Sequence, residues 1–225
     1  MNQNVSKLNA AKKAVEFIEN GMVVGLGTGS TAKIAIDLIG EKISEDFQII
    51  GMPTSKKTEK QAINLGIKLI GIDDAETIDL AIDGADEVSP DLALIKGLGG
   101  ALLREKKVEK KAKELIIIID ESKLVKKLGE GFLPVEIKSS NYKNILIQIS
   151  KLKCETQLRI ESDNRPFITD NGNYICHCKF KNGISDPREL DKNIMKIDGV
   201  IDTGLFIDMA TKIIVGNNTG TKIID

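Results

Sequence analysis

The stretch VVGLGTGST (residues 23–31) places three glycines and three hydroxyl side chains directly after a short apolar run. The run itself is typical of a buried strand, and helical periodicity resumes at Thr31. Where a strand turns into a helix in this way, backbone N–H groups and the helix dipole favour an anion. The stretch therefore predicts an α/β fold with a candidate ligand turn. A plain turn in which Ser30 or Thr31 caps the helix remains an open alternative.

Outward from this turn, apolar strands alternate with amphipathic helices over the first half of the chain. This alternation predicts a parallel sheet covered on both faces. The predicted helices span residues 8–20, 31–38, 55–66 and 99–114, and the predicted strands span 22–27, 47–52, 67–72, 79–87, 92–96 and 114–120.

The second half has a different order of elements. The patterns follow one another as strand, helix, strand, two strands around an Asp-Asn-Gly turn, helix and strand, which resembles a ferredoxin-like unit. A further apolar run in residues 208–220 can return to the first sheet. The predicted domains are residues 1–129 plus 205–225, and 130–204.

The bulk composition is that of an ordinary globular protein. The 32 basic and 33 acidic residues nearly balance, so neither nucleic acid nor an anionic membrane is an expected partner. The amino terminus lacks the apolar core of a signal peptide and no apolar run is long enough for a bilayer, so a cytoplasmic location is expected. Three cysteines, all in the second half, argue against a disulfide framework.

The glycine turn does not fit a dinucleotide or an ATP site. A dinucleotide fingerprint beginning at Gly25 requires glycine at position 30, which is serine, and a phosphate-binding loop of the ATPase type requires lysine after Gly29. What remains is a glycine turn whose hydroxyls, on Thr28, Ser30 and Thr31, can cap the helix and donate to a single phosphate group.

Two further stretches offer acid–base groups. IDGADE (residues 82–87) crowds Asp83, Asp86 and Glu87, and such crowding raises the pKa of a carboxyl group where the site is partly buried. A solvated acidic turn or a divalent-metal site is the alternative. In KGLGGALLREK (residues 96–106), Glu105 falls on a stripe of small apolar residues with Ala101, Val108 and Ala112, and it is the best candidate for a base.

The only histidine lies between Cys176 and Cys178. In a strand both cysteines face one side and His177 faces the other, so the three side chains cannot bind one metal ion. His177 is therefore expected to take no part in the chemistry.

Several separated motifs in order now resemble one family, the type A ribose-5-phosphate isomerases. They are GLGTGST, DGADE, KGLGGA followed by REK, and DESK, with DNGN and DTGLF later in the chain. The resemblance implies interconversion of D-ribose 5-phosphate and D-ribulose 5-phosphate in the non-oxidative pentose phosphate pathway, without metal or organic cofactor. It also implies a doubly wound, mostly parallel Rossmann-like sheet with an inserted ferredoxin-like α+β domain, and a homodimer or homotetramer.

The resemblance also assigns roles to residues. It implies that Glu105 is the general base, that Asp83 and Asp86 bind sugar hydroxyls and assist ring opening, and that Lys96 stabilises the oxyanion. The substrate-binding residues that it implies are Lys7, Thr28, Gly29, Ser30, Thr31, Gly84, Ala85, Gly97, Leu98, Gly99 and Lys123. Leu98 and Leu103 depart from the residues usual in the family.

Two rival functions have a related architecture. A sugar-phosphate sensor domain needs no base beside a lysine and two aspartates, and the chain has no separate helix-turn-helix region. A sugar-phosphate deaminase or a coenzyme A transferase is the other rival; the motifs of the deaminase are not visible, and the transferase needs a nucleotide pocket.

Overall fold

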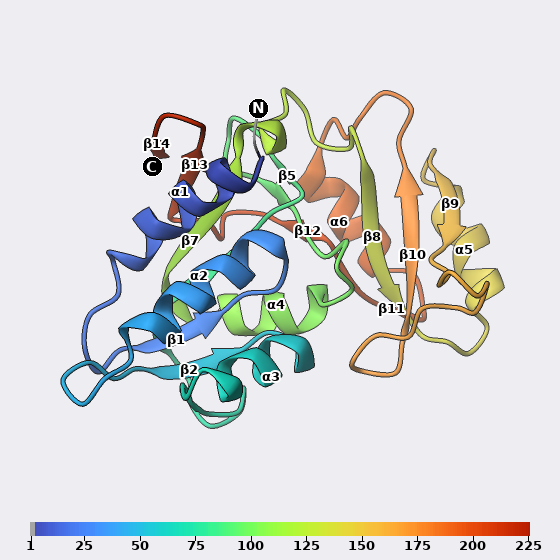
Figure 1. The fold of residues 1–225 in the computed structure, drawn as a ribbon. Coiled ribbons are helices and arrows are strands. Elements are labelled where there is room, and N and C mark those ends of the chain that lie inside the picture. The colour runs from blue at the N-terminus through green and yellow to red at the C-terminus, as the bar shows by residue number, and fades with distance from the viewer. Residues whose placement is uncertain (1–2) are drawn as a thin grey trace. The chain divides into compact units, whose positions relative to one another are not determined.

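The computed structural model of the chain describes residues 3–225, which divide into two compact units (Figure 1). The larger unit contains residues up to 85 together with 104–123 and 209–225, and the smaller unit contains 86–103 and 124–208. These bounds differ from the expected domains chiefly in residues 86–103, which pack within the smaller unit. The domain boundaries expected from the sequence stay a prediction.

The larger unit is built on a seven-stranded sheet in the order β14-β13-β7-β4-β1-β2-β3. All neighbouring strands are parallel except β13 and β14, so the apolar run near the carboxyl terminus does return to this sheet as β13, beside β7. The strands are β1 (Val23–Leu26), β2 (Ile50–Pro53), β3 (Lys68–Leu69), β4 (Ile78–Asp83), β7 (Ala112–Asp120), β13 (Lys212–Gly216) and β14 (Thr221–Ile224).

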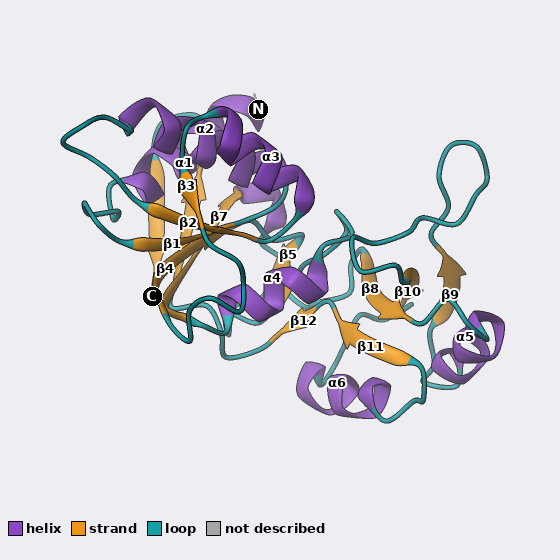
Figure 2. Cartoon of the chain, turned by 90° about the horizontal axis from the view of Figure 1, so that it is seen from below, coloured by secondary structure: helices purple, strands orange, loops and turns teal. Residues whose placement is uncertain are grey.

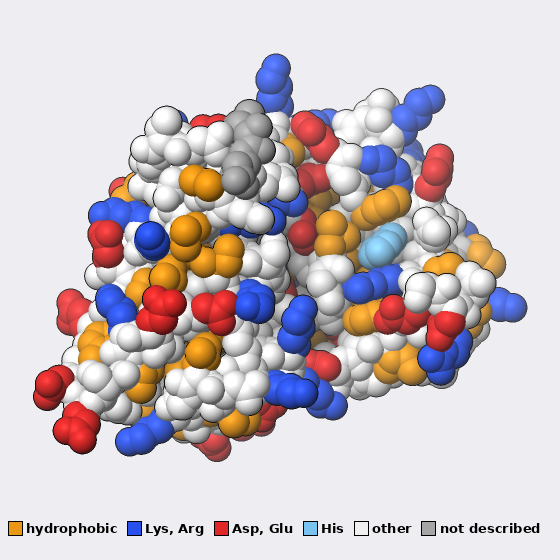
Figure 3. Space-filling model, in the orientation of Figure 1, with side chains coloured by type: hydrophobic (Ala, Val, Ile, Leu, Met, Phe, Trp, Pro, Cys, Tyr) orange, Lys and Arg blue, Asp and Glu red, His pale blue; other side chains and the backbone are white. Residues whose placement is uncertain are grey.

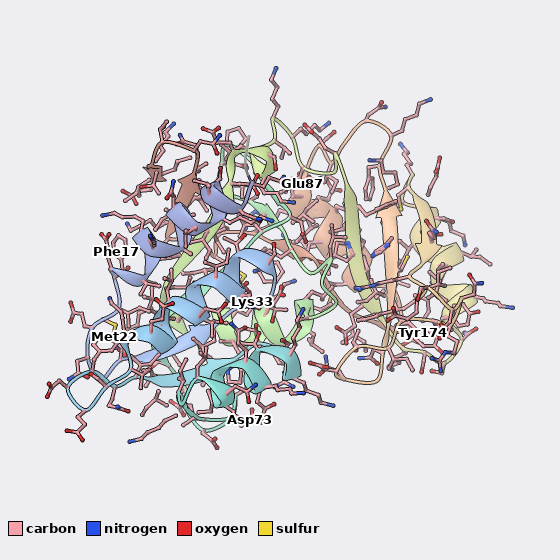
Figure 4. The ribbon with its side chains drawn as sticks, viewed as in Figure 1. Phe17, Met22, Lys33, Asp73, Glu87 and Tyr174 are labelled. Atoms are coloured by element: carbon pink, nitrogen blue, oxygen red, sulfur yellow. The ribbon has the colours of Figure 1, made fainter. Side chains whose placement is uncertain are left out.

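Helices lie on both faces of this sheet, which makes the unit doubly wound as expected. Figure 2 shows α1 (Gln3–Val15), α2 (Ser30–Lys42) and α3 (Lys56–Asn64) on one face and α4 (Leu102–Glu109) on the other. The core under the first three helices contains Ala11, Ile36, Leu80 and Ile116, with the partly buried Phe17 and Met22 packed against it (Figure 4). Across residues 3–225, no helix combines the length and hydropathy that a membrane span requires.

The smaller unit contains the ferredoxin-like arrangement. Its four-stranded antiparallel sheet has the order β11-β8-β10-β9, with α5 and α6 as the two crossover helices. The elements are β8 (Phe132–Ile137), α5 (Tyr142–Ser150), β9 (Glu155–Leu158), β10 (Tyr174–Lys179), α6 (Pro187–Met195) and β11 (Val200–Thr203). A second sheet of three short strands joins β5 (Glu87–Val88), β6 (Leu94–Ile95) and β12 (Leu205–Phe206).

The helix expected over residues 99–114 is wrong at its carboxyl end. The helix α4 ends at Glu109, and Ala112 already begins β7, where it pairs with Ile78 of β4. The N–H of Ile78 donates to the carbonyl of Lys111 at 2.9 Å. Pairing in a central strand therefore outweighs the helix propensity of the lysine-rich sequence, and Ala112 is not on the stripe of Glu105.

The pair of strands expected around the Asp-Asn-Gly turn is half correct. Only β10 forms, because the preceding residues fold into a local turn in which Thr169 N–H donates to Asn173 O at 2.9 Å. The expected single strand over 200–206 is also divided between two sheets. The division falls at Gly204, where a Cβ atom would lie 2.4 Å from the carbonyl oxygen of Lys96.

Candidate active site

The carboxyl ends of the central parallel strands bring several predicted site residues to one edge of the larger unit's sheet. The strand order reverses between β1 and β4, which is where open α/β sheets bind ligands. The turn 27–31 follows β1, Asp83 ends β4, and Lys123 lies half-buried in the short 3₁₀ helix η1 (Glu121–Lys123) after β7. Parallel strands place these segments at the same edge.

The turn that follows β1 is open at the amino terminus of α2. Gly29 is the N-cap residue, with a φ of 130° that favours glycine, and no side chain caps the helix. Ser30 and Thr31 therefore do not serve as the N-cap. The exposed Ser30 instead accepts a hydrogen bond from Lys7 Nζ at 3.0 Å. A helix amino terminus beside a hydroxyl and an ammonium group is suited to a phosphate.

Asp83 links this turn to β4. The side chain is only 1% exposed, and its Oδ1 accepts hydrogen bonds from the N–H groups of Thr28 at 2.9 Å and Gly84 at 2.7 Å. The contact depends on Gly27, because a Cβ atom there would lie 2.2 Å from Asp83 Oδ1 and 2.6 Å from Asp83 Cα. Gly27 therefore permits the close approach of Asp83 to the turn.

Glu105 lies inside the larger unit, not in solvent. Its side chain is 2% exposed, and a carboxylate oxygen of Glu105 comes within 4.8 Å of oxygens of both Asp83 and Glu109. Three buried carboxylates therefore offer oxygen ligands at one place. This cluster has the chemistry of a proton-transfer site, and its oxygens could also hold a divalent ion.

The predicted site residues of the smaller unit form a hydrogen-bonded loop. Asp86 is half-buried and its Oδ2 accepts the N–H of Leu98 at 3.0 Å. The carbonyl of Leu98 accepts Nη1 of Arg159 at 2.8 Å, and the guanidinium group of Arg159 stacks 3.6 Å from the centre of the Phe167 ring. The peptide of Leu98 is thus held from both sides, although leucine departs from the usual family residue here.

Lys96 begins the same loop and is 2% exposed. Its Nζ lies 5.3 Å from the centre of the Phe206 ring, and its backbone N–H donates to Gly204 O at 2.9 Å. Gly97 has a φ of 93°, and a Cβ atom there would meet Leu102 Cβ at 2.4 Å. Gly99 is exposed.

Glu87 does not belong with Asp83, although both fall in the acidic stretch. The Glu87 carboxylate accepts the N–H groups of Gly129 and Gly131 within the smaller unit, and its side chain is 6% exposed. Its role in the structure is to hold a turn. The carboxylates near Asp83 come from α4 instead, and Glu109 was missed because nothing in the local pattern marks it.

The Cys-His-Cys strand is arranged as expected. Cys176 and Cys178 are fully buried with their Sγ atoms 3.6 Å apart, whereas His177 is half-buried and stacks on Phe132 at 5.3 Å. Burial, and secondarily the charge of Arg159, lowers the pKa of His177. Hydrogen bonds to the thiols of Cys154 and Cys176, together with burial, raise the pKa of Cys178.

Three hydroxyl residues at the site escaped prediction. Thr54, Ser55 and Thr58 surround the Thr28 side chain, from the end of β2 and the first turn of α3. The available signal was the polar sequence Thr-Ser directly after a strand. On the face drawn in Figure 3, basic and acidic side chains are intermixed, in keeping with the balanced composition.

Comparison with known proteins identifies relatives over the full chain. Residues 50–220 match the family model described as ribose 5-phosphate isomerase A (phosphoriboisomerase A). A ribose-5-phosphate isomerase A of Bacillus mycoides is 50% identical over 213 residues, which cover 95% of this chain and 96% of that protein. A probable chloroplastic ribose-5-phosphate isomerase of Arabidopsis thaliana is 48% identical, over all of this chain and 84% of that protein.

Solved structures give the same result. A D-ribose-5-phosphate isomerase in complex with phospho-erythronic acid has a TM-score of 0.95 and 42% identity, with both chains fully covered. A ribose 5-phosphate isomerase A of Methanocaldococcus jannaschii has a TM-score of 0.94 and 40% identity, again over both full chains. The chain therefore belongs to the ribose 5-phosphate isomerase A family, and its activity is that of a ribose-5-phosphate isomerase of the pentose phosphate pathway.

Proposed function

We propose that Glu105 is the base that moves a proton between C2 and C1 of the sugar, through an enediolate, as D-ribose 5-phosphate and D-ribulose 5-phosphate interconvert. The observation that carries this assignment is the position of Glu105. Its carboxylate is buried beside Asp83, and Asp83 ends β4 at the point where the strand order reverses.

The environment of Glu105 suits this chemistry. A glutamate with an ordinary pKa near 4.3 is a weak base toward a C–H bond. Burial is one of the ways in which enzymes strengthen a catalytic carboxylate as a base, and the Glu105 side chain is 2% exposed. General base catalysis of this kind supplies roughly 10²- to 10⁴-fold in rate.

The other predicted residues then bind the substrate and stabilise charge. Asp83 and Asp86 would hold sugar hydroxyls and assist ring opening, and the ammonium group of Lys96 would stabilise the enediolate oxyanion. Lys7, Ser30 and Thr31, at the open amino terminus of α2, would bind the phosphate. The remaining predicted contacts to the substrate are Thr28, Gly29, Gly84, Ala85, Gly97, Leu98, Gly99 and Lys123. The proposed reaction uses no metal ion or organic cofactor.

Substitution Glu105→Gln tests the base. It keeps the shape of the side chain and replaces the basic carboxylate with a neutral amide, so turnover should fall by about 10²- to 10⁴-fold while substrate still binds. The direct readout is deuterium from solvent appearing at C1 of ribulose 5-phosphate, followed by NMR. Glu109→Gln is the matched control, because Glu109 lies one helical turn away in the same carboxylate cluster.

The two variants separate the possible outcomes. Loss of exchange in Glu105→Gln with exchange retained in Glu109→Gln supports the assignment. Near-normal exchange in Glu105→Gln overturns it, provided that circular dichroism shows both variants folded.

We further propose that the chain forms a homodimer or homotetramer and acts in the cytoplasm. Both statements rest on the family resemblance and on the sequence. Light scattering on the purified protein measures the first, and a monomer at micromolar concentration would contradict it.

A further inference from the structure

Arg159 lies in the smaller unit and contacts the loop that begins at Lys96. Its Nη1 donates a hydrogen bond to the carbonyl of Leu98 at 2.8 Å. The guanidinium group also stacks on the ring of Phe167, 3.6 Å from its centre. This arrangement uses the two properties that distinguish arginine from lysine, a planar cation that stacks and directional donors in its plane. Arg159 therefore reaches the loop in one defined orientation.

The loop from Lys96 to Gly100 is itself a tight turn. Gly100 N–H donates to Gly97 O at 2.8 Å, and the two glycines have positive φ angles of 89° and 93°. A Cβ atom at Gly100 would lie 2.4 Å from the ring of Phe167 and 3.0 Å from Arg159 Nη1. The stacked pair of side chains therefore packs against the end of the loop and also binds its middle.

The segment that carries Arg159 is fixed to the four-stranded sheet of the smaller unit. Arg159 N–H donates to Ile175 O at 2.9 Å, and Phe167 N–H donates to Arg159 O at 3.0 Å. Glu136 of β8 is completely buried, and its Oε1 accepts three hydrogen bonds from side chains of the turn 169–173. The donors are Thr169 Oγ1 at 2.9 Å, Asn171 Nδ2 at 3.1 Å and Asn173 Nδ2 at 2.8 Å. Arg159 thus contacts the loop from a rigid support, as a residue that orients a functional group must.

We infer that Arg159 is a positioning residue for the isomerase reaction: it holds the loop 96–100 in the conformation that brings Lys96 to the developing oxyanion. The inference rests on the proposed function, because the role of Lys96 is itself proposed. Arg159 acts through the carbonyl of Leu98 and through the packing of Phe167 on the loop, with no contact to the sugar. Stabilisation of an oxyanion requires preorganised groups, and a misplacement of about 1 Å can cost roughly 100-fold in rate.

The substitution Arg159→Met tests this role, because methionine keeps much of the apolar stem and removes both the donor and the charge. We expect kcat for ribose 5-phosphate to fall about 10- to 100-fold, the effect of one charge-assisted hydrogen bond. The KM should change less than about threefold, since the oxyanion forms only in the transition state. Arg165→Met is the matched control and should keep both constants. Arg165 belongs to the same segment, but its side chain is 82% exposed and pairs with Asp163 at 2.6 Å.

The loop can also be followed without turnover, by ¹H–¹⁵N NMR of the unliganded protein. The nitrogen of Gly99 shares a peptide unit with the carbonyl of Leu98. The amide signals of Gly99 and Gly100 should therefore move in Arg159→Met and stay in place in Arg165→Met.

A lower kcat with KM retained and displaced loop signals supports the inference. Unchanged kcat in Arg159→Met overturns it, as does a raised KM with kcat retained, or a loss of kcat with the loop signals in place. Should Arg159→Met not fold, Arg159→Lys takes its place, because lysine keeps the charge and lacks the planar group; wild-type kcat there overturns the inference.

Lys96→Met separates this inference from the proposal on which it rests. Normal kcat in Lys96→Met would refute the role of Lys96. Normal kcat in Arg159→Met, with kcat lost in Lys96→Met, would refute only the positioning role of Arg159. The assignment of the base is tested apart from both, by solvent exchange in Glu105→Gln.

Discussion

In the variant Glu87→Gln, the smaller unit should unfold at a distinctly lower urea concentration. Glu87 lies in the same acidic stretch as the proposed active-site aspartates, but we expect its substitution to affect stability. Glu87 begins β5 (Figure 4) and is 6% exposed. Its Oε2 accepts the N–H of Gly129 at 2.6 Å and that of Glu130 at 3.3 Å, and its Oε1 accepts the N–H of Gly131. One carboxylate thus accepts three consecutive backbone N–H groups of the turn 129–131, and the bond to Gly129 is buried.

The magnitude follows from these bonds. A hydrogen bond to a charged group contributes about 1.5–3 kcal/mol, and a buried donor left without its acceptor costs about 1–3 kcal/mol. Glutamine keeps one oxygen and turns an N–H₂ group toward at least one of the three donors. We expect the free energy of unfolding to fall by about 2–4 kcal/mol, since the loss is one charged acceptor partly compensated by the remaining oxygen.

Tyrosine fluorescence during urea denaturation measures this change selectively. The chain has no tryptophan and two tyrosines, Tyr142 and Tyr174, which form an edge-to-face pair at 5.5 Å within the smaller unit. Glu130→Gln is the matched control, because Glu130 belongs to the same turn but its side chain is exposed. Equal midpoints for Glu87→Gln and Glu130→Gln would refute the reasoning.

Three further predictions concern pH, packing and metal. Because burial lowers the pKa of His177 below 6.5, the unfolded chain binds the proton more readily, so stability should fall as the pH drops through about 6.5. In His177→Gln, urea titrations between pH 6 and 7.5 should show a weaker dependence of the free energy of unfolding on pH. The substitution should leave kcat unchanged, and a large loss of kcat would instead identify His177 as a catalytic group. Gly27→Ala should cost about 1–3 kcal/mol and most of the activity, because the added Cβ meets the backbone of Asp83. Gly220→Ala is the control: its added Cβ meets no atom within 4 Å, so its stability in thermal melts should change by less than about 1 kcal/mol. Treatment with a chelator should leave turnover unchanged, and inhibition reversed by added Mg²⁺ or Mn²⁺ would instead identify the buried carboxylates as a metal site.

The fold could be predicted where the pattern is local and repeated. Apolar strands of β1, β4 and β7 are buried on both faces of the sheet, so their sequences are recognisable without any knowledge of their neighbours. The prediction was wrong where a distant partner decides. The end of α4 depends on the pairing of Ala112 with Ile78, and the missing strand before β10 depends on a turn whose side chains bind Glu136. Both partners are too far away in the sequence for a local pattern to reveal them.

The residues of the candidate site likewise divide into those that a local pattern predicts and those that depend on distant partners. The burial of Glu105 was predictable because a charged residue on an apolar helical stripe stands out. The hydroxyl cluster around Thr28 was not, since it joins residues about 30 positions apart through ordinary serine and threonine side chains. The hydrogen bonds of Leu98 were not predictable for a related reason: Asp86 and Arg159 bind its backbone N–H and carbonyl groups, which every residue type other than proline carries.

The glycine turn after β1 and Asp83 at the end of β4 belong to separate motifs in the sequence but are in direct contact in the structure. The turn after β1 requires glycine at position 27 because Asp83 occupies the space that a Cβ atom there would need. The same close approach lets the backbone N–H of Thr28 donate a hydrogen bond to Asp83. Asp83 in turn lies within the carboxylate cluster of Glu105. A change in the turn that moves Thr28 therefore moves the electrostatic neighbour of the proposed base. Substrate binding and proton transfer should for this reason fail together when Gly27 is altered, and separately when Ser30 or Glu105 is altered.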